Sequence, residues 1–419
     1  MLGKIIKPVY LIFNEMGIRK LLGVERADIL VGIPSYNNAS TIAYVVDQVS
    51  KGLDKFFPHM KSVIIVSDGN SDDGTREIAK SINLPKNIDL IATIYDGVPG
   101  KGSAIKLALE VAKRLGCRAM AMVDSDLRSI TPEWMHLIIQ PIIEGAGLVT
   151  PRYFRYKYDG TITNQVIYPF TLSLFGVNIR QPIGGDFGLS KELITLMINS
   201  PLWRTPYTPR FGIDISITHT ALAHGLEVKE AFLGSKIHDV KDPTKHLGPM
   251  FKQVIGALFT CTDLYFDKWK NINSIHDPSI VRGSIGDQEP EPFEVDYKSA
   301  LNAFRYGLER HQGTIQRVLP NYLLQSLKES SAGGATITAK DWARITYHFA
   351  SYFNKVREEV KDEVIEAFKV CWIGRVGNFV RETLGLSNSE AEARIVSDAE
   401  AFVQEKPYLV SLWRNEFGL

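Results

Sequence analysis

Residues 119–126 read AMAMVDSD, an unbroken apolar run that ends in two aspartates. A short continuous apolar run of this kind is typical of a strand that is buried on both faces of a parallel sheet. Ligands bind beyond the carboxyl ends of such strands, and this is where Asp124, Ser125 and Asp126 come. Two carboxylates separated by one residue can bind a divalent cation, which in turn neutralises a diphosphate. Because turns also favour aspartate, the pair alone does not identify a cation site, and other sequence features must agree with it.

Strands and helices alternate along the first part of the chain, from residue 28 onward. Apolar runs predict strands at 28–33, 61–67, 88–94 and 119–123, and helices follow at 41–49, 75–81 and 103–115. Unbroken strands between amphipathic helices indicate a parallel sheet that is covered on both faces. The expected fold class is therefore α/β.

The composition excludes several classes of protein. The 419 residues carry 48 basic and 47 acidic side chains, and 45% of them are hydrophobic. This balance excludes a disordered chain, and no region has the basic excess of a duplex nucleic-acid binder. The three cysteines are odd in number and widely spaced, so neither a disulfide framework nor a metal site is expected of them.

The N-terminal residues suggest no export or membrane insertion. No cleavable signal is apparent, and residues 9–22 are expected to pack against the protein as an amphipathic helix. No apolar stretch approaches the roughly 18 residues of a membrane span. We therefore expect a cytoplasmic protein without integral membrane association and without a nucleic-acid partner.

The C-terminal part of the chain follows a different, helical pattern. A chain of this length is larger than a single hydrophobic core usually supports, so two domains are expected. The turn-rich residues 277–293 are expected to be a domain edge or a linker. Beyond them, apolar spacing predicts helices at 296–311, 314–329, 339–357, 359–383 and 388–405. Thr338 and either Ser387 or Asn388 are candidate N-caps. This helical part is expected to support the rest of the chain and to form a homodimer.

Three further loops follow the predicted strands at the same edge of the sheet. In PSYNN (34–38), Tyr36 can stack on a nucleobase. Asp68 ends the second strand in SDGNSDDGT (67–75), where its carboxylate can accept from a uracil or guanine N–H. In PGKG (99–102), glycines let the backbone approach a ligand, and Lys101 at a helix start adds charge for phosphate. The last loop matches neither a Walker loop nor a dinucleotide fingerprint.

In this order, the four segments resemble the nucleotide-sugar-binding half of family 2-like glycosyltransferases of the GT-A fold, over residues 28–130. Downstream, QPIGGD (181–186), FGID (211–214) and GSKIH (234–238) are similar to the retaining mannosylglycerate and glucosylglycerate synthases and to their relatives that act on 3-phosphoglycerate. The resemblance extends over about 28–265. It implies a GT-A nucleotide-sugar-binding domain, with a mostly parallel sheet and flanking helices, followed by a mainly α-helical C-terminal domain.

The resemblance also implies a division of the chain and a set of site residues. The catalytic domain is expected at 1–275, with a donor part at 28–130 and an acceptor part at 131–265, and the helical domain at 276–419. Donor-binding residues are expected to be Pro34, Ser35, Tyr36, Asn38, Asp68, Lys101, Asp124, Ser125 and Lys236. A Mg²⁺ or Mn²⁺ ion is expected on Asp126 and a neutral His238, with Asp124. Acceptor-binding residues are expected to be Arg152, Thr161, Thr163, Asn164, Gly184 and Asp214.

The candidate catalytic residues are Asp186, Asp214 and Lys101, and Asp186 stands where the family has a glutamate. The expected reaction moves glucose or mannose from a GDP- or UDP-sugar to D-glycerate with retention, which gives an α-glycosylglycerate compatible solute. The metal would stabilise the leaving diphosphate, and attack on the same face would be assisted by the leaving phosphate.

Other functions remain open at this point. The acceptor can be 3-phosphoglycerate, or the chain can be an inverting family 2 transferase in which Asp186 or Asp214 is the general base. A non-catalytic sugar-nucleotide scaffold is the alternative from another class. A nucleotidyltransferase is disfavoured because its glycine-rich loop should follow the first strand, where PSYNN stands instead. The sequence does not decide the base, the hexose or the phosphorylation of the acceptor.

Overall fold

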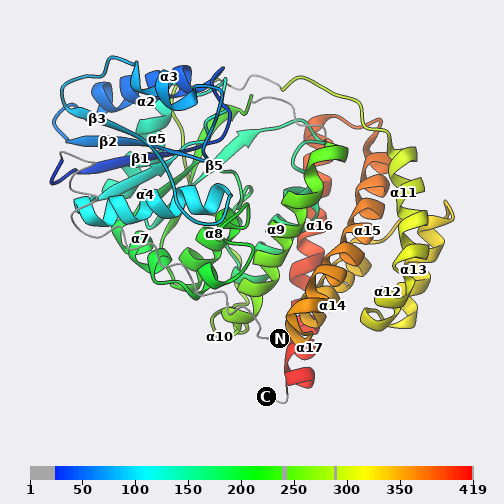
Figure 1. Cartoon of the computed structure of the whole chain (residues 1–419). Coiled ribbons are helices and arrows are strands. Elements are labelled where there is room, and N and C mark those ends of the chain that lie inside the picture. The colour runs from blue at the N-terminus through cyan, green and yellow to red at the C-terminus, as the bar shows by residue number, and fades with distance from the viewer. Residues whose placement is uncertain (1–23, 238–242, 287–289, 418–419) are drawn as a thin grey trace, which may run out of the picture.

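The computed structural model describes residues 24–237, 243–286 and 290–417, and a sheet of eight strands runs through this part of the chain (Figure 1). The strand order is β3-β2-β1-β4-β6-β5-β7-β8. The strands are β1 (Ile29–Ser35), β2 (Ser62–Asp68), β3 (Ile88–Ile94), β4 (Ala119–Met122), β5 (Leu148–Phe154), β6 (Phe187–Ser190), β7 (Val228–Ser235) and β8 (Ser279–Val281).

The first four strands confirm the predicted parallel pattern, and β6 departs from it. β1 pairs in parallel with β2 and β4, and β2 with β3. β6 is antiparallel to both of its neighbours, β4 and β5. Gly188 lets β6 pack closely, because a Cβ there would lie 2.5 Å from the carbonyl oxygen of Ile138. The sheet is therefore mostly parallel, with one reversed strand beside β4, the strand that Asp124 follows.

Helices cover both faces of the sheet, as the alternating pattern predicts. One face carries α2 (Ile42–Phe56), α3 (Thr75–Lys80) and α5 (Glu133–Ile143), and the other carries α4 (Lys101–Leu115), α7 (Lys191–Ile198) and α8 (Ile213–Ala223) (Figure 1). The amphipathic spacing of α2 explains its position, because Val45, Val46, Val49 and Leu53 are all fully buried against the strands.

Two helices lead from the sheet to the C-terminal part of the chain. They are α9 (Pro243–Leu264) and the short α10 (Phe266–Trp269). The helices that follow are α11 (Tyr297–Arg310), α12 (Gln312–Val318), α13 (Asn321–Ser331), α14 (Ala339–Lys355), α15 (Glu358–Thr383), α16 (Asn388–Gln404) and α17 (Lys406–Phe417). Four of the five predicted helices are confirmed, within one or two residues at each end.

The predicted helix over 314–329 is wrong, since the chain forms two helices there. They are separated at Leu319 and Pro320, where proline has no N–H to continue the helical hydrogen bonds. The predicted N-caps are confirmed at Thr338, whose hydroxyl accepts from the N–H of Asp341, and at Ser387, which forms a capping box with Glu390.

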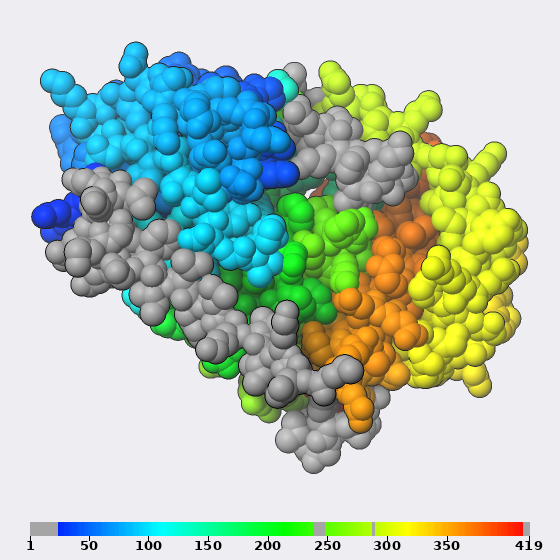
Figure 2. All heavy atoms as spheres, viewed as in Figure 1, coloured from blue at the N-terminus to red at the C-terminus, as the bar shows by residue number. Residues whose placement is uncertain are grey.

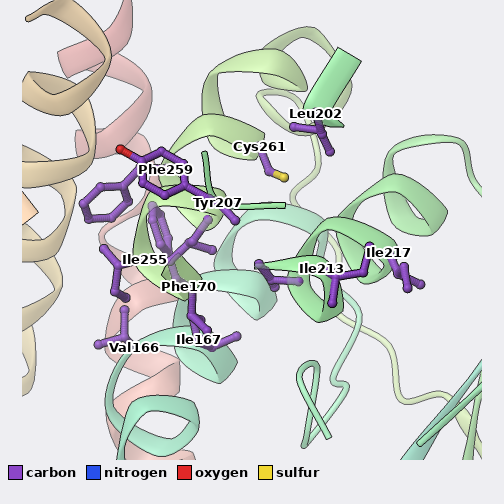
Figure 3. Packing of buried hydrophobic residues seen from close by; sticks show 14 of the residues in the cluster. Val166, Ile167, Phe170, Leu202, Tyr207, Ile213, Ile217, Ile255, Phe259 and Cys261 are labelled. Atoms are coloured by element: carbon purple, nitrogen blue, oxygen red, sulfur yellow. The ribbon is translucent and has the colours of Figure 1, made fainter. Parts of the chain in front are cut away.

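The C-terminal helices share a hydrophobic core with the helices under the sheet. Phe170 of α6 (Tyr168–Phe175) contacts the rings of Phe259 and Tyr347, at centroid distances of 6.4 and 5.4 Å. Figure 3 shows Val166, Ile255 and Phe259 packed around Phe170 in this cluster. In the face seen in Figure 2, the green segments join the blue and cyan part of the sheet to the orange and yellow helices.

The sheet also extends past the predicted domain boundary at residue 275. β8 lies in the stretch expected to be a linker, and it pairs in parallel with β7. Gly283 and Ser284 then pack on α5, where the N–H of Ser284 donates to a carboxylate oxygen of Glu133 at 2.7 Å. Among the described residues, each helix is too short or too polar to span a bilayer. The predicted helix at 9–22 lies outside the described residues.

Candidate active site

Five charged side chains form one chain of ion pairs beyond the carboxyl end of β4. The ammonium group of Lys101 contacts Asp214 Oδ2 at 3.2 Å and Asp124 Oδ1 at 2.9 Å. The ammonium group of Lys236 contacts Asp124 Oδ2 and Asp186 Oδ2, both at 2.8 Å. The order is therefore Asp214–Lys101–Asp124–Lys236–Asp186, with negative and positive groups alternating. The structure thus brings together these five residues, all of which the sequence singled out.

The topology explains why residues so far apart in sequence meet here. Asp124 follows β4 closely, and Asp186 directly precedes β6, the antiparallel neighbour of β4. Lys101 begins α4, Asp214 lies in the first turn of α8, and Lys236 follows β7. Each of these positions is an element end at one edge of the sheet, which is the usual place for a ligand site in an α/β protein.

The glycines of the PGKG loop contact protein backbone. A Cβ at Gly102 would lie 1.9 Å from the carbonyl oxygen of Thr208, and one at Gly100 would lie 2.7 Å from that of Pro209. The N–H groups of Gly102 and Ser103 donate to carbonyls of residues 210 and 209, at 3.1 and 2.8 Å. The expectation that this backbone approaches a ligand is therefore corrected. The glycines instead dock α4 against the segment before α8, which places Lys101 beside Asp214.

The two glycines of QPIGGD have a similar packing role. Gly185 has a φ of +93°, and a Cβ there would lie 2.6 Å from Asp124 Oδ2. A Cβ at Gly184 would lie 2.2 Å from the ring of Pro151. The carbonyl of Gly184 accepts a hydrogen bond from Lys236 Nζ at 3.0 Å. Gly184, a predicted acceptor residue, therefore lets the QPIGGD segment pack closely against β5, and Gly185 lets it pack against Asp124.

Burial and the two lysines set the charge states of the three aspartates. Burial raises the pKa of Asp186 and of Asp214, although a neighbouring lysine opposes each rise. Burial acts in the same direction on Asp124, but the ammonium groups of Lys101 and Lys236 outweigh it and hold its pKa well below the usual range. Three carboxylates and two ammonium groups leave a formal charge of −1 when all are ionised.

One carboxylate oxygen of Asp214 lacks a hydrogen-bond donor among the described residues. Its Oδ2 contacts Lys101, whereas its buried Oδ1 accepts no hydrogen bond from any residue that the structure describes. A buried carboxylate oxygen without a donor is costly, so such atoms usually find a partner. A hydroxyl group of a sugar or of an acceptor would satisfy this oxygen.

Asp186 is fully satisfied by the protein, which corrects its assignment as a residue that acts on substrate. Its Oδ1 accepts from the backbone N–H of Asp124 at 2.8 Å, and its Oδ2 accepts from Lys236 Nζ and from the hydroxyl of Tyr153. No part of Asp186 is exposed. The side chain therefore positions the Asp124 loop, and it cannot reach a hydroxyl of a bound molecule without losing these contacts.

The structure supports fewer metal ligands than the three predicted ones, Asp124, Asp126 and His238. Both oxygens of Asp124 are paired with lysines, so direct coordination of a cation by Asp124 is not supported. Asp126 is half-buried in the same loop. His238 lies outside the described residues, and the described part of the chain holds no group of three or more acidic, histidine or cysteine ligands. The backbone of Ile237 is hydrogen-bonded to Arg128 N–H and to the Ser129 hydroxyl, at 2.8 and 3.0 Å.

The donor loops are joined to this cluster by hydrogen bonds between side chains. Asn38 accepts from the hydroxyl of Ser125 at 2.8 Å, which ties the first loop to the DSD loop. Tyr36 projects from the same loop with 66% of its surface exposed, so its ring is accessible to a nucleobase. Pro34 is half-buried beside it, at the end of β1. Stacking on Tyr36 stays a prediction.

The predicted contact between Asp68 and a nucleobase is corrected. The Asp68 carboxylate is fully buried and accepts from Ser35 Oγ at 2.9 Å, from Ser71 N–H at 2.7 Å and from Ser71 Oγ at 2.6 Å. Arg76 donates to it at 2.5 Å. Although burial opposes them, these donors lower the pKa of Asp68. Asp68 and Ser35 therefore shape the donor loops from inside the protein.

Two of the predicted acceptor residues, Gly184 and Asp214, lie at the ion-pair chain, and the other four lie in two further places. Arg152 of β5 donates to Glu230 Oε2 of β7 at 2.8 Å, next to an irregularity in strand pairing between Arg152 and Tyr153. Thr161 and Thr163 are half-buried where the chain enters η1 (Thr163–Ile167), a short π-helix. Such helices occur frequently at functional sites.

Asn164, in contrast, is buried and uses its amide within the protein. Its Nδ2 donates to the carbonyl of Asp159 at 2.9 Å, and its Oδ1 accepts from Arg180 at 2.9 Å. Direct contact between Asn164 and an acceptor is therefore corrected to a supporting role.

Sequence reasoning missed Arg180 and Glu230, and it gave Tyr153 no role of its own within the expected acceptor segment. Glu230 is fully buried, and its other oxygen accepts from the backbone N–H of Arg180 at 2.8 Å. A glutamate inside the otherwise apolar run EAFLG was a signal for a buried partner. Arg180 precedes QPIGGD directly, and Tyr153 adjoins the predicted Arg152, so both could have been considered with those motifs.

Comparisons with known proteins gave matches to solved structures and to one family model. Among solved structures, glucosyl-3-phosphoglycerate synthase from Mycobacterium tuberculosis with Mn²⁺, UDP and glucosyl-3-phosphoglycerate is 26% identical, over 56% of this chain and 80% of that one, with a TM-score of 0.45. The same enzyme with Mg²⁺ and UDP is 25% identical over 56% and 79%, also with a TM-score of 0.45. No curated protein sequence gave a significant match. Residues 30–194, which extend from β1 through β6, match the model of glycosyl transferase family 2.

Proposed function

We propose that this protein transfers a hexosyl group from a nucleoside diphosphate hexose to a glycerate-type acceptor. The observation that carries the proposal is the ion-pair chain, in which Asp214 Oδ1 has no donor among the described residues. Three of its five members, Lys101, Asp124 and Asp186, lie within residues 30–194, which match the family 2 model. Two buried ammonium groups at a strand edge suit a diphosphate, and a buried carboxylate oxygen suits a sugar or a polyol. The same combination is not needed for a scaffold that only packs against other proteins.

A divalent cation, Mg²⁺ or Mn²⁺, is part of the proposal. Asp126 would hold it together with His238, and when bound the cation would neutralise the diphosphate of the donor. The backbone contacts of Ile237 with Arg128 and Ser129 support this pair, since residue 238 follows Ile237 directly in the chain. Asp124 would act through its two lysines, which it holds in fixed positions for the phosphate oxygens.

The proposed reaction proceeds with retention at the anomeric carbon. The bond from this carbon to the diphosphate oxygen breaks, an acceptor hydroxyl bonds to the same face, and its proton passes to the leaving diphosphate. We do not assign a covalent nucleophile to these carboxylates. Asp186 is fully buried, and Asp214 is ion-paired with Lys101. Asp214 would orient a hydroxyl, and Lys101 would add positive charge where the leaving group gains negative charge.

D-glycerate is our preferred acceptor, with 3-phosphoglycerate as the alternative. Two cationic groups near the predicted acceptor residues are already balanced by carboxylates, since Arg152 pairs with Glu230 and Arg155 with Asp159, at 2.8 and 2.9 Å. This balance favours an acceptor with a single carboxylate over one with an additional phosphate. The choice of glucose or mannose, the cytoplasmic location, the homodimer and the role of the product as a compatible solute stay predictions from the sequence.

The test is a matrix of UDP- and GDP-hexoses against D-glycerate and 3-phosphoglycerate, with Mg²⁺ or Mn²⁺. We expect metal-dependent transfer to a glycerate-type acceptor and an α linkage in the NMR spectrum of the product. A β linkage would replace retention by inversion, with Asp214 as the candidate base. Binding of UDP or GDP without transfer from any donor would favour a scaffold. Asp214→Asn should reduce turnover by at least tenfold, because it weakens both the ion pair and the hydroxyl contact.

A further inference from the structure

The π-helix that follows the predicted acceptor threonines is held from outside by the C-terminal helices. Trp342 of α14 donates from Nε1 to the carbonyl of Gln165 at 2.6 Å. Arg375 of α15 donates from Nε to Gln165 Oε1 at 3.1 Å. Both donors are buried, and their partner lies two residues after Thr163. These bonds attach the predicted acceptor segment to α14 and α15. The same bonds do not involve the predicted donor residues.

A third attachment comes from α16 and reaches the same segment through an arginine. Glu392 of α16 accepts from Arg180 in a bidentate pair, with Nε to Oε1 at 2.6 Å and Nη2 to Oε2 at 2.8 Å. The same Nη2 atom donates to Asn164 Oδ1 at 2.9 Å. A carboxylate that accepts two hydrogen bonds from a guanidinium fixes the plane of the guanidinium. It thereby also fixes the direction of the Nη2–H bond that points to Asn164.

Arg180 also connects Arg152 with the threonine segment 161–164, two places where predicted acceptor residues lie. Its backbone N–H donates to Glu230 Oε1, and Glu230 Oε2 accepts from Arg152. Its guanidinium reaches Asn164, next to Thr163. A displacement of Arg180 would therefore disturb both Arg152 and the threonine segment, while the ion pairs of Asp124 do not depend on it.

We propose that Glu392 is a positioning residue for the acceptor site, acting through Arg180 on Asn164 and on the π-helix. The assignment of this segment to the acceptor depends on the proposed function. Glu392 is suited to a test because its side chain is 45% exposed, so its removal leaves no buried hole. Arg375 and Trp342, by contrast, are fully enclosed in the core, and their replacement would disturb folding.

The experiment compares Glu392→Ala with Glu400→Ala in the full-length protein. Glu400 is an exposed glutamate on the same helix, so both variants lose one carboxylate from α16. Hydrogen–deuterium exchange is measured on peptides that cover residues 160–167, and steady-state kinetics are measured for donor and acceptor separately. We expect faster exchange in this segment and an acceptor KM raised about tenfold for Glu392→Ala, with donor KM and kcat near wild type. Glu392→Gln, which keeps one acceptor oxygen, should recover part of the loss.

The results can overturn the positioning role of Glu392, its specificity for the acceptor, or the proposed function. Unchanged exchange at 160–167 in Glu392→Ala, or equal changes in Glu400→Ala, would overturn the positioning role. A rise in donor KM equal to that in acceptor KM would overturn its specificity for the acceptor. If the wild-type protein transfers to no acceptor, the proposed function fails, and the exchange measurement still decides whether Glu392 orders the segment.

Discussion

Replacement of Lys236 by methionine tests the ion-pair chain by its effect on stability. Methionine is similar in length and apolar, so the substitution removes charge and hydrogen bonds with little change in volume. Lys236 lies between two carboxylates, and it is the one cation that contacts Asp186 among the described residues. Breaking a buried pair by removing one partner costs about 3–5 kcal/mol. We expect a loss of this size in the free energy of unfolding near neutral pH.

The loss should depend on pH in a direction that follows from Asp186. Burial and the Asp124 charge raise the pKa of Asp186, and Lys236 opposes the rise, so the variant should raise this pKa further. A carboxyl group whose folded pKa lies above its unfolded value retains its proton in the folded state, and stability falls as pH increases. The slope is about 1.4 kcal/mol per pH unit for one proton, or up to about 2.7 kcal/mol between pH 5 and pH 7.

The assay is urea denaturation of the wild type and the variant at pH 5, 6, 7 and 8, followed by circular dichroism. Lys229→Met is the matched control, since Lys229 lies on the same β7 and pairs with the exposed Glu227 at 3.8 Å. An exposed pair contributes about 0–1 kcal/mol, so this control should change stability little at any pH. Adding Asp186→Asn to Lys236→Met should remove the pH dependence. Equal destabilisation at pH 5 and pH 8, or a loss no larger than in the control, would refute the reasoning.

Three further changes test separate parts of the site. Gly185→Ala should destabilise the protein by about 1–3 kcal/mol in urea, because φ is positive and the added Cβ would lie 2.6 Å from Asp124 Oδ2; a neutral result would contradict the packing. Tyr36→Ala should weaken UDP or GDP binding by about 1 kcal/mol or more in calorimetry, and unchanged affinity would exclude stacking. Asp126→Asn should abolish the rise in Tm that Mn²⁺ adds to nucleotide binding, and a retained rise would exclude Asp126 as a ligand.

Sequence patterns predicted the element ends well because the chemistry of those ends is local. The apolar run before Asp124 predicts a strand, and the glycines around Lys101 predict a helix start, whatever the rest of the chain does. Strand order then places these ends at one edge, so that Lys101 and Asp214 meet although 113 positions separate them. The pattern of strands and helices predicted the position of Lys101, whereas Asp214 was expected only from the family resemblance, and their ion pair was not predicted.

Sequence patterns did not show which carboxylates face a ligand and which face the protein. Asp68 and Asp186 end or adjoin strands at the same edge as Asp124, and both are fully buried. The donors to Asp68 come from three different positions, Ser35, Ser71 and Arg76, whose convergence depends on the folded loops. A carboxylate is equally suited to a sugar hydroxyl and to a serine hydroxyl, so its residue type alone could not separate the two.

The hydrogen bonds of the three aspartates distinguish Asp214 from the other two. Along the chain of ion pairs, Asp124 has a lysine on each oxygen, and Asp186 has donors on both of its own. Asp214 differs because its Oδ1 is buried and receives no hydrogen bond among the described residues. The missing donor therefore lies at one end of the chain, beside Lys101. The nucleoside diphosphate hexose of the proposed function carries a hydroxyl that could donate to Asp214 and anionic oxygens that could contact Lys101.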